Sequence, residues 1–447
     1  MSAPVYPFEV RHRDVWTIAL PATFAFVTEP LAGLVDLTLV GRLGDAALLG
    51  GLVLGVLVFD FLFSITFFVR LGTAGLVAQA VGARDEDKAL THLVRALLFG
   101  TALGLLAILL APLINWVSLA LIAPQPDVLP AFEDYFGVRI WSGPMVLINF
   151  ALLGWFYGRA EATTGLLLQV VVHVGNMVLS ALFVFGLGCG VAGVALGTVI
   201  AQTIAAILGL WLVAQRYGGV AAIYQRVPNH VLLDLAGIRR MLSLSRDLMI
   251  RSIALMSAFA FFTAQTARMG TLELSANAIV LNFLMITAFL LDGQAQAAEQ
   301  ISGKAIGANY KPAFLRAMKL AHFWGYVISG LLFVFWLVAG PWMIELMTTA
   351  DDVRQQARIY VPVAALTALT GVMPFVMDGI TIGATLNTIL RNGMVVALIV
   401  FLTLAMILQP LFGIMGLWAA LHLWFVTRGL VFLFAVWRKI PKLFPAG

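Results

Sequence analysis

Long, almost uncharged runs of apolar residues recur along the whole chain of 447 residues, separated by short charged segments. A helix that crosses the hydrocarbon core of a bilayer needs about 20 apolar residues, so each run is long enough to span a membrane. A spanning segment must satisfy its own backbone hydrogen bonds, and for runs of this length the α-helix does so. Charged residues make up 11% of the chain, against about 25% in soluble domains. The sequence therefore predicts an all-α polytopic membrane protein.

Twelve of these runs are predicted to be transmembrane helices. Their approximate bounds are 14–41, 47–82, 88–115, 130–158, 162–187, 190–215, 240–268, 273–303, 315–346, 353–382, 385–410 and 413–437. The second and the eighth are longer than a bilayer requires. We expect them to tilt, or to break near Arg70-Leu71-Gly72 and near Asp292-Gly293, because glycine weakens a helix.

The basic residues of the loops predict the orientation. Lys and Arg gather at both chain ends and in the gaps after even-numbered helices, whereas the other gaps carry only Arg42, Arg268 and Arg354. Because cytoplasmic loops carry the excess of Lys and Arg, both termini are expected in the cytoplasm of a bacterial cell, in a multi-pass inner-membrane protein. The net charge of +5 is spread between spans and forms no basic stripe, so no nucleic-acid partner is expected.

The two halves of the chain repeat one another. Arg42-Leu43-Gly44 is echoed by Arg268-Met269-Gly270, and Gly154-x-x-x-Gly158 by Gly379-x-x-x-Gly383, about 225 residues later. The predicted organisation is two pseudo-symmetric six-helix lobes, an N-terminal lobe at 1–215 and a C-terminal lobe at 240–447. The hydrophilic segment 216–239 is predicted to join them as a cytoplasmic linker. Secondary transporters built from such repeats bind substrate and coupling ion between the halves and rock them in alternation.

One acid lies inside the first apolar run. Asp36 would be costly to bury as an ion at bilayer depth, so such a residue normally faces a protein interior or a wet cavity, where desolvation favours the neutral acid. Pro21 and Pro30 each remove a backbone donor, so the helix that carries Asp36 can bend. A titratable group on a bendable helix suggests a switch driven by protonation, and transport is the first hypothesis.

Several motifs resemble those of one transporter family. They are Pro21, the run from Pro30 through Gly33, Val35, Asp36 and Gly41 to Gly44, the spacing Gly72-x-x-Gly75-x-x-Ala-Gln79-x-x-Gly82, the segment Leu291-Asp292-Gly293 with Glu299, Gly303 and Gly307, and Asp378-Gly379-x-x-Ile-Gly383-Ala384-Thr385. Together they resemble the multidrug and toxic compound extrusion (MATE) transporters, and among them the DNA-damage-inducible F (DinF) branch. The similarity covers nearly the whole chain.

The resemblance implies two six-helix lobes around a central cavity and efflux of amphipathic, often cationic compounds in exchange for protons or sodium ions. It also implies that an acid on the first helix works with polar residues on the fourth to sixth helices, here Asp36 with Asn149, Asn176 and Thr198. Many relatives carry a second acid where this chain has Ser180. Hard cations prefer more carboxylate and carbonyl oxygens than this set offers, so a proton suits the site better than sodium. No cofactor besides the coupling ion, and no metal site, is expected.

For several other residues, two interpretations remain open from the sequence alone. Glu29 lies two turns before Asp36 and either titrates in the same cavity or sits at interfacial depth. Asp292 and Asp378 either bind the cation or substrate, or brace the second lobe. Met285 and Phe289 are candidates for an adaptable surface that accepts varied hydrophobic drugs.

Rival functions make different demands on the sequence. A sodium-coupled drug antiporter or a flippase for a lipid-linked precursor would keep the same fold. A flippase is expected to line its cavity with several cations, and the spans contain few, namely Arg70, Arg139, Arg251, Arg358 and Arg428. No P-loop or catalytic constellation indicates an enzyme, although a membrane enzyme and a passive channel remain rivals. The expected partners are drugs and membrane lipids, and the expected state is a monomer. Cys189, the single cysteine, excludes an internal disulfide.

Overall fold

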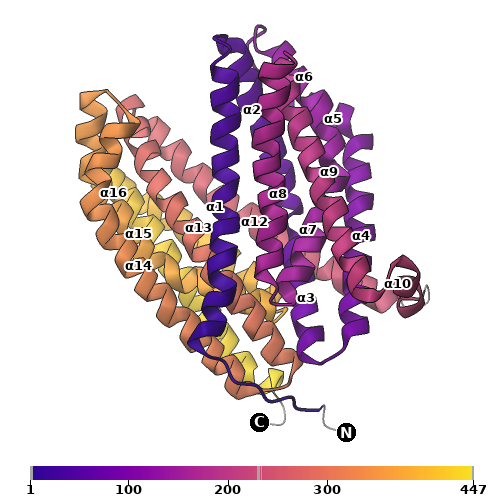
Figure 1. Cartoon of the computed structure of the whole chain (residues 1–447). Helices are drawn as coiled ribbons and strands as arrows, with labels where there is room; N and C mark the ends of the chain where they lie inside the picture. The colour runs from indigo at the N-terminus through magenta and orange to yellow at the C-terminus, as the bar shows by residue number, and fades with distance from the viewer. Residues whose placement is uncertain (1–3, 229–231, 233, 445–447) are drawn as a thin grey trace. The chain divides into compact units, whose positions relative to one another are not determined.

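The computed structural model describes residues 4–228, 232 and 234–444, and every regular element in this part of the chain is helical (Figure 1). The elements are α1 (His12–Gly41), α2 (Ala46–Thr66), α3 (Phe68–Gly82), α4 (Glu86–Leu109), α5 (Ala111–Ile122), α6 (Leu129–Arg139), η1 (Ile140–Ser142), α7 (Gly143–Gly158), α8 (Ala162–Ala181), η2 (Leu182–Gly186), α9 (Gly190–Tyr217), α10 (Val220–Arg226), α12 (Leu235–Arg268), α13 (Thr271–Gly307), α14 (Lys311–Met347), α15 (Asp351–Gly383) and α16 (Asn387–Leu443).

Eleven helical stretches of the described residues are long and apolar enough to cross a membrane. The last of them, α16, is two helices in one, because Gly413 adopts φ 58° and ψ −137°, a backbone conformation that interrupts the helix. Counting its two parts separately gives the predicted twelve spans. The predicted fold class, an all-α polytopic membrane protein, is confirmed.

Three local details differ from the prediction. The second span breaks at Phe67, between α2 and α3, a few residues before the predicted glycine. The eighth, α13, is unbroken, so of the two expected outcomes, a tilt or a break near Asp292-Gly293, the break does not occur. Gly293 instead permits close packing, since a Cβ there would lie 2.7 Å from the carbonyl oxygen of Ala19 on α1. The third predicted span ends early at Leu109, and a separate short apolar helix, α5, follows it.

The chain forms two compact units. The C-terminal unit consists of the chain up to Thr23, Gly82–Arg84 and everything from Arg246 onward, and the N-terminal unit consists of Phe24–Val81 and Asp85–Ser245. Helix α1 therefore begins in the C-terminal unit and ends in the N-terminal unit. The lobe bounds 1–215 and 240–447 and the linker 216–239 stay predictions.

Aromatic side chains fill the core of the C-terminal unit. Phe283 stacks on Trp336 with ring centroids 4.4 Å apart, and Phe262 meets Trp418 edge to face at 5.1 Å. Both ends of the described chain pack at the turn between α13 and α14: the Tyr6 amide donates to the Ala308 carbonyl, and the Phe444 ring lies against Phe314. Two chain ends on one side of the unit require an even number of crossings.

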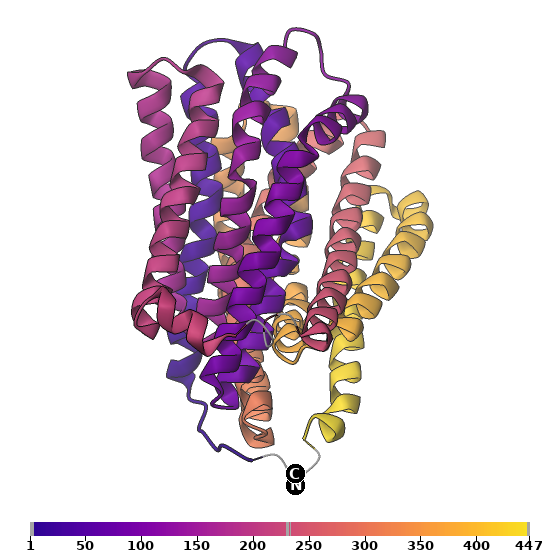
Figure 2. The ribbon, with the colours of Figure 1, turned by 90° about the vertical axis from the view of Figure 1, so that its right-hand side faces the viewer.

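The N-terminal unit has its own core between α2, α6 and α9, where Phe59, Phe136 and Val194 are buried. Helix α8 packs against α9, and α4 against α7 (Figure 2). Large apolar side chains such as Leu109 and Leu121 point outward, which is the surface that a lipid environment requires.

Candidate functional site

Asp36 lies on the part of α1 that belongs to the N-terminal unit, and its side chain is half-buried. Ser180 on α8 donates a side-chain hydrogen bond to its carboxylate, and Asn176 lies beside it as a polar neighbour. The other carboxylate oxygen, Oδ1, is buried and has no hydrogen-bond partner among the described residues. The acid is thus partly solvated by neutral donors and keeps one acceptor unused.

The polar residues around Asp36 form one hydrogen-bonded group. The Asn176 Nδ2 donates to Thr198 Oγ1 on α9 at 2.8 Å and to Ser180 Oγ at 3.2 Å, and Thr198 in turn donates to the Val194 carbonyl. Gly197 allows this approach of α9 to α8, because a Cβ there would lie 2.7 Å from the Ser180 amide nitrogen. The structure therefore brings Asp36, Asn176, Ser180 and Thr198 together.

Asn149 has a different partner. Its Nδ2 donates to the side chain of Gln202 at 2.7 Å and to the Gln202 carbonyl at 2.9 Å, which ties α7 to α9. Its Oδ1 is buried without a partner in the described part of the chain. Asn149 is thus a buried polar residue of the same unit, but its side chain donates to Gln202 and not to Asp36.

Sequence reasoning named Arg139 only as one of the cations in the spans, yet it is the charged neighbour of Asp36. Its side chain is buried on α6 between the rings of Phe59 and Phe63, 5.4 and 5.2 Å from their centroids, and it hydrogen-bonds Ser142. No ion pair within 4.0 Å joins it to Asp36 in the described structure. The sequence marked Arg139 only as a cation inside an apolar run. It could not be assigned to Asp36, because the two residues lie about a hundred positions apart in the chain.

The helix that carries Asp36 contains both predicted hinge residues. Pro21 and Pro30 lie within α1, which remains one continuous helix (Figure 1). The division between the two units falls at Thr23, two residues after Pro21. Glu29 is exposed on the same helix. A helix with missing backbone hydrogen bonds near the point where it changes unit is suited to bending there.

In the C-terminal unit, Asp378 lies in a buried cluster of charges. It accepts from Arg251 at 2.5 Å and from Arg428, whose side chain is 1% exposed. Asp292 acts on Arg428 electrostatically. The acid predicted as a cavity residue is therefore neutralised by two guanidinium groups of the protein itself.

The two apolar cavity candidates lie on α13 together with Asp292. Met285 is 38% exposed and Phe289 is half-buried. Their spacing places Met285, Phe289 and Asp292 on one face of the helix. The predicted substrate-facing residues of this lobe thus share a stripe, and their role stays a prediction.

A network of ion pairs links three helices at one end of the N-terminal unit. Arg159, between α7 and α8, binds Glu86 at 2.6 Å and Glu161 at 3.0 Å, and Arg216 also binds Glu161. Burial disfavours the charge of Arg159, but the two carboxylates outweigh it and raise the pKa of the guanidinium above its ordinary value. The network joins α4, α8 and α9. Its charged groups pair with one another, so it is not a candidate substrate site.

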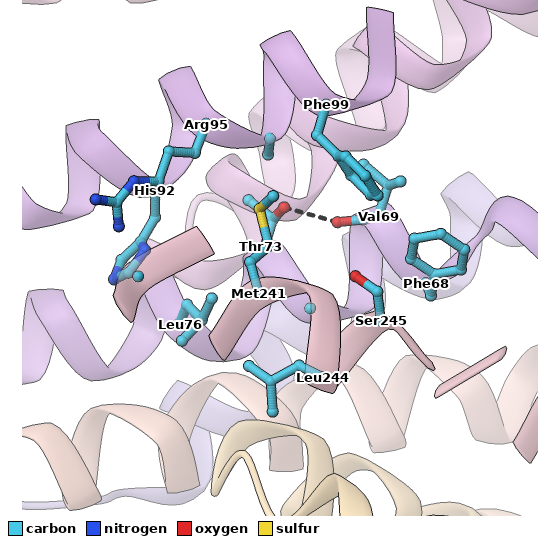
Figure 3. A pocket seen from close by; sticks show the side chains of 13 residues that line it. Phe68, Val69, Thr73, Leu76, His92, Arg95, Phe99, Met241, Leu244 and Ser245 are labelled. Atoms are coloured by element: carbon cyan, nitrogen blue, oxygen red, sulfur yellow. Dashed lines mark hydrogen bonds between the residues drawn. The ribbon is translucent and has the colours of Figure 1, made fainter. Parts of the chain in front are cut away.

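A small pocket lies where the start of α12 covers α3 and α4 (Figure 3). Figure 3 shows His92 and Arg95 on one wall, Met241 and Ser245 on another, and Thr73, whose hydroxyl donates to the Val69 carbonyl. Its volume of ≈ 20 Å³ has room for one water-sized group. It therefore cannot hold a drug.

Known proteins match both the sequence and the fold. A family model described as MatE matches residues 21–182 and 248–411. DNA damage-inducible protein F of Escherichia coli (strain K12) is 35% identical over 430 residues, which covers 96% of this chain and 92% of that protein. Multidrug export protein MepA of Staphylococcus aureus (strain MW2) is 22% identical, covering 90% and 88%.

Solved structures agree with the fold. An outward-facing multidrug resistance MATE family transporter superposes with a TM-score of 0.87 at 17% identity, covering 97% of this chain and 96% of that one. A MATE transporter of Vibrio cholerae in the bent form gives 0.86 at 17% identity, with 97% of each chain covered. At these identities the likeness establishes the shared fold alone.

Proposed function

Because this chain belongs to the MatE family of multidrug efflux transporters, as its motifs indicated, we propose that it exports amphipathic, often cationic compounds in exchange for protons. The observation that carries the proposal is Asp36: an acid in a membrane span, bonded to neutral donors and left with one buried, unpartnered oxygen. We place the protein in a bacterial inner membrane with both termini in the cytoplasm, as the loop charges predict.

In the ionised state, Asp36 accepts from Ser180 and is attracted by Arg139. These interactions hold the distal part of α1 against α8. The proximal part, up to Thr23, belongs to the other unit. The charge of Asp36 thus acts on the distal part of α1, a helix that begins in one unit and ends in the other.

Protonation changes these contacts. A neutral carboxyl group accepts more weakly from the Ser180 hydroxyl, loses its attraction to Arg139, and itself becomes a donor. We expect α1 then to bend near Pro21, the cavity of the N-terminal lobe to shrink, and the bound compound to leave. Release of the proton on the cytoplasmic side restores the first state and completes an alternating cycle.

The composition of the group around Asp36 supports a proton over sodium as the coupling ion. It offers one carboxylate, two hydroxyls and an amide whose Nδ2 already donates to its neighbours. Hard cations are held by six or more oxygen ligands in flexible sites, several of them carboxylate or carbonyl oxygens. A proton needs only one acceptor, and Asp36 Oδ1 is one.

The arginines of the spans speak against transport of a pyrophosphate-linked lipid. Arg251 and Arg428 bind Asp378, and Arg358 binds Glu345. Arg139 and Arg70 lie over aromatic rings. A phosphate site needs cations that are available to the ligand, whereas these are already engaged within the protein.

The test is drug-dependent proton movement in liposomes that contain the purified protein. With Asp36→Asn, which keeps the size and polarity of the side chain, proton-driven efflux of a fluorescent lipophilic cation should be lost while the protein remains folded. Asp134→Asn on α6, an exposed acid of the same unit, is the matched control and should transport normally.

The driving gradient is then varied. Efflux that follows an imposed proton gradient and ignores a sodium gradient supports the proposal. Undiminished efflux by Asp36→Asn, or efflux that follows sodium alone, contradicts the coupling. Turnover of the compound without a gradient would indicate an enzyme, and flux far above any alternating cycle would indicate a channel.

A further inference from the structure

A second, larger cavity lies in the C-terminal unit, beside the turn between α12 and α13. Its volume is ≈ 410 Å³, within the range of about 300–1,000 Å³ that is usual for sites of drug-sized ligands. Met269, Glu273, Tyr360, Phe412 and Met415 line it, all from the same unit. Neither the coupling acid nor the charge cluster of Asp378 contributes to it.

Glu273 supplies a negative charge that forms no ion pair with any basic residue in the described part of the chain. Its carboxylate accepts from the Tyr360 hydroxyl at 2.5 Å and from Gln356 Nε2 at 2.9 Å, both neutral donors on α15. In the described structure no basic group lies within 4.0 Å of it, and the cavity lining contains none. Two buried acids elsewhere in the unit differ, since Asp247 is paired with Arg391 at 2.7 Å and Asp378 with two arginines.

The walls are apolar and aromatic. Phe412 is 64% exposed at the rim, just before Gly413, where the positive φ turns α16 back on itself. Met269 and Met415 complete the apolar surface. Aromatic faces attract cations, and methionine adapts to ligands of different shape. A carboxylate without a counter-ion at such walls matches a cation that carries an apolar body.

We propose that this cavity is a binding site for amphipathic organic cations, with Glu273 facing the charge and Phe412, Met269 and Met415 contacting the apolar part. The site lies at the opposite end of α13 from the turn that holds both chain ends. With the termini in the cytoplasm, as proposed above, it opens on the external side. Its lining shares no residue with the group around Asp36.

The competing explanation is structural. An acid in the first turn of α13 interacts favourably with the helix dipole, and its bonds to Tyr360 and Gln356 join α13 to α15. A purely structural Glu273 predicts no effect on ligand affinity, or an equal effect on ligands of either charge. The two explanations therefore separate in a binding experiment.

The experiment uses the full chain in nanodiscs of neutral lipid and measures binding of tetraphenylphosphonium by calorimetry, with protein-free nanodiscs as the blank. Tetraphenylborate, which has the same shape and the opposite charge, is the second probe. All measurements are made with Asp36→Asn, in which the proposed coupling cannot operate. Binding at the cavity is thereby tested whether or not the transport proposal holds.

Glu273→Gln, which preserves the size of the side chain and keeps one of its two acceptor oxygens, should lower the affinity for tetraphenylphosphonium about tenfold. Phe412→Ala should lower it severalfold. The matched controls, Glu345→Gln in the exposed ion pair with Arg358 and Leu411→Ala beside Phe412, should bind normally. Tetraphenylborate should not displace the cation.

Equal affinity of Glu273→Gln and its parent overturns the proposal. So does a loss that affects the cation and the anion alike. A further measurement guards against unfolding: the thermal transition of Glu273→Gln should match that of its parent. If the thermal transition of Glu273→Gln falls, the proposal is tested instead by comparing the cation affinity of Phe412→Ala with that of Leu411→Ala, because Phe412 lies at the surface.

Discussion

Removing the charge of Asp378 should strongly destabilise the C-terminal unit. Asp378→Asn leaves Arg251 and Arg428 close together without their shared carboxylate, with side chains that are 14% and 1% exposed. Breaking a buried ion pair by removing one partner costs about 3–5 kcal/mol, because the remaining charge is left desolvated. Two guanidinium groups depend on this carboxylate, so we expect the upper part of that range.

The same geometry predicts that removing the whole cluster is mild. Replacing Arg251 and Arg428 by Met together with Asp378 by Leu eliminates every desolvated charge of the triad. Buried ion pairs and triads replaced by apolar residues of similar volume are often neutral or more stable. The triple variant should therefore unfold within about 1 kcal/mol of the wild type, although it carries three changes where the single variant carries one.

The free energy of unfolding can be measured in mixed micelles by titration with a denaturing detergent, followed by tryptophan fluorescence. Asp351→Asn is the matched control, since its carboxylate is 82% exposed and pairs with Arg354 at the surface. Surface pairs contribute about 0–1 kcal/mol, so this control should change little. A loss below about 1 kcal/mol for Asp378→Asn, or a triple variant as unstable as the single one, would refute the reasoning.

Two further substitutions probe how the helices are held. Gly293→Ala should impair folding or transport because its Cβ would lie 2.7 Å from the Ala19 carbonyl of α1, whereas Gly330→Ala, with nothing within 4 Å, should be neutral or stabilise by about 0.5–1 kcal/mol in the same detergent titration. Arg159→Ala should lower the free energy of unfolding by about 1–3 kcal/mol, since Glu86 loses its ion pair and Glu161 keeps only the one with Arg216. Arg226→Ala, in an exposed pair, should cost less than about 1 kcal/mol, and equal losses for the two arginines would contradict this account.

The sequence predicts the helices better than their interruptions. Apolar runs of membrane-spanning length indicate the number of spans, because an α-helix of this length satisfies its own backbone hydrogen bonds in lipid. Even the division of the last long helix was predicted, at Gly413. The exact position of the break, at Phe67, and the continuity of α13 were not predicted. A glycine in a helix can indicate either a weak point of that helix or the close approach of another one. At Gly293 the neighbouring helix decides between the two, and the neighbour is unknown until the chain is folded.

The residues of the candidate site were likewise predicted only in part. Asp36, Asn149, Asn176, Ser180 and Thr198 were named together from motifs on four different helices, and the structure gathers all of them except Asn149, which bonds Gln202. Arg139 was counted among the cations of the spans but not assigned to this group. The pairing of Asp378 with Arg251 and Arg428 was not foreseen either, since those partners are 127 and 50 residues away. Periodicity places a charge on a face of a helix, but tertiary packing selects its counter-ion.

The repeat that relates the two halves does not extend to their charges. About 225 residues after Asp36 the chain has Phe261, and the same distance before Asp378 it has Leu153. One unit thus carries an acid in a span that lacks an ion pair, and the other carries an acid held by two arginines. This asymmetry predicts opposite outcomes for the two neutralising variants: Asp36→Asn should abolish coupling without loss of stability, and Asp378→Asn should lose stability first. Variants that fail in the reverse order would place the coupling acid in the other half.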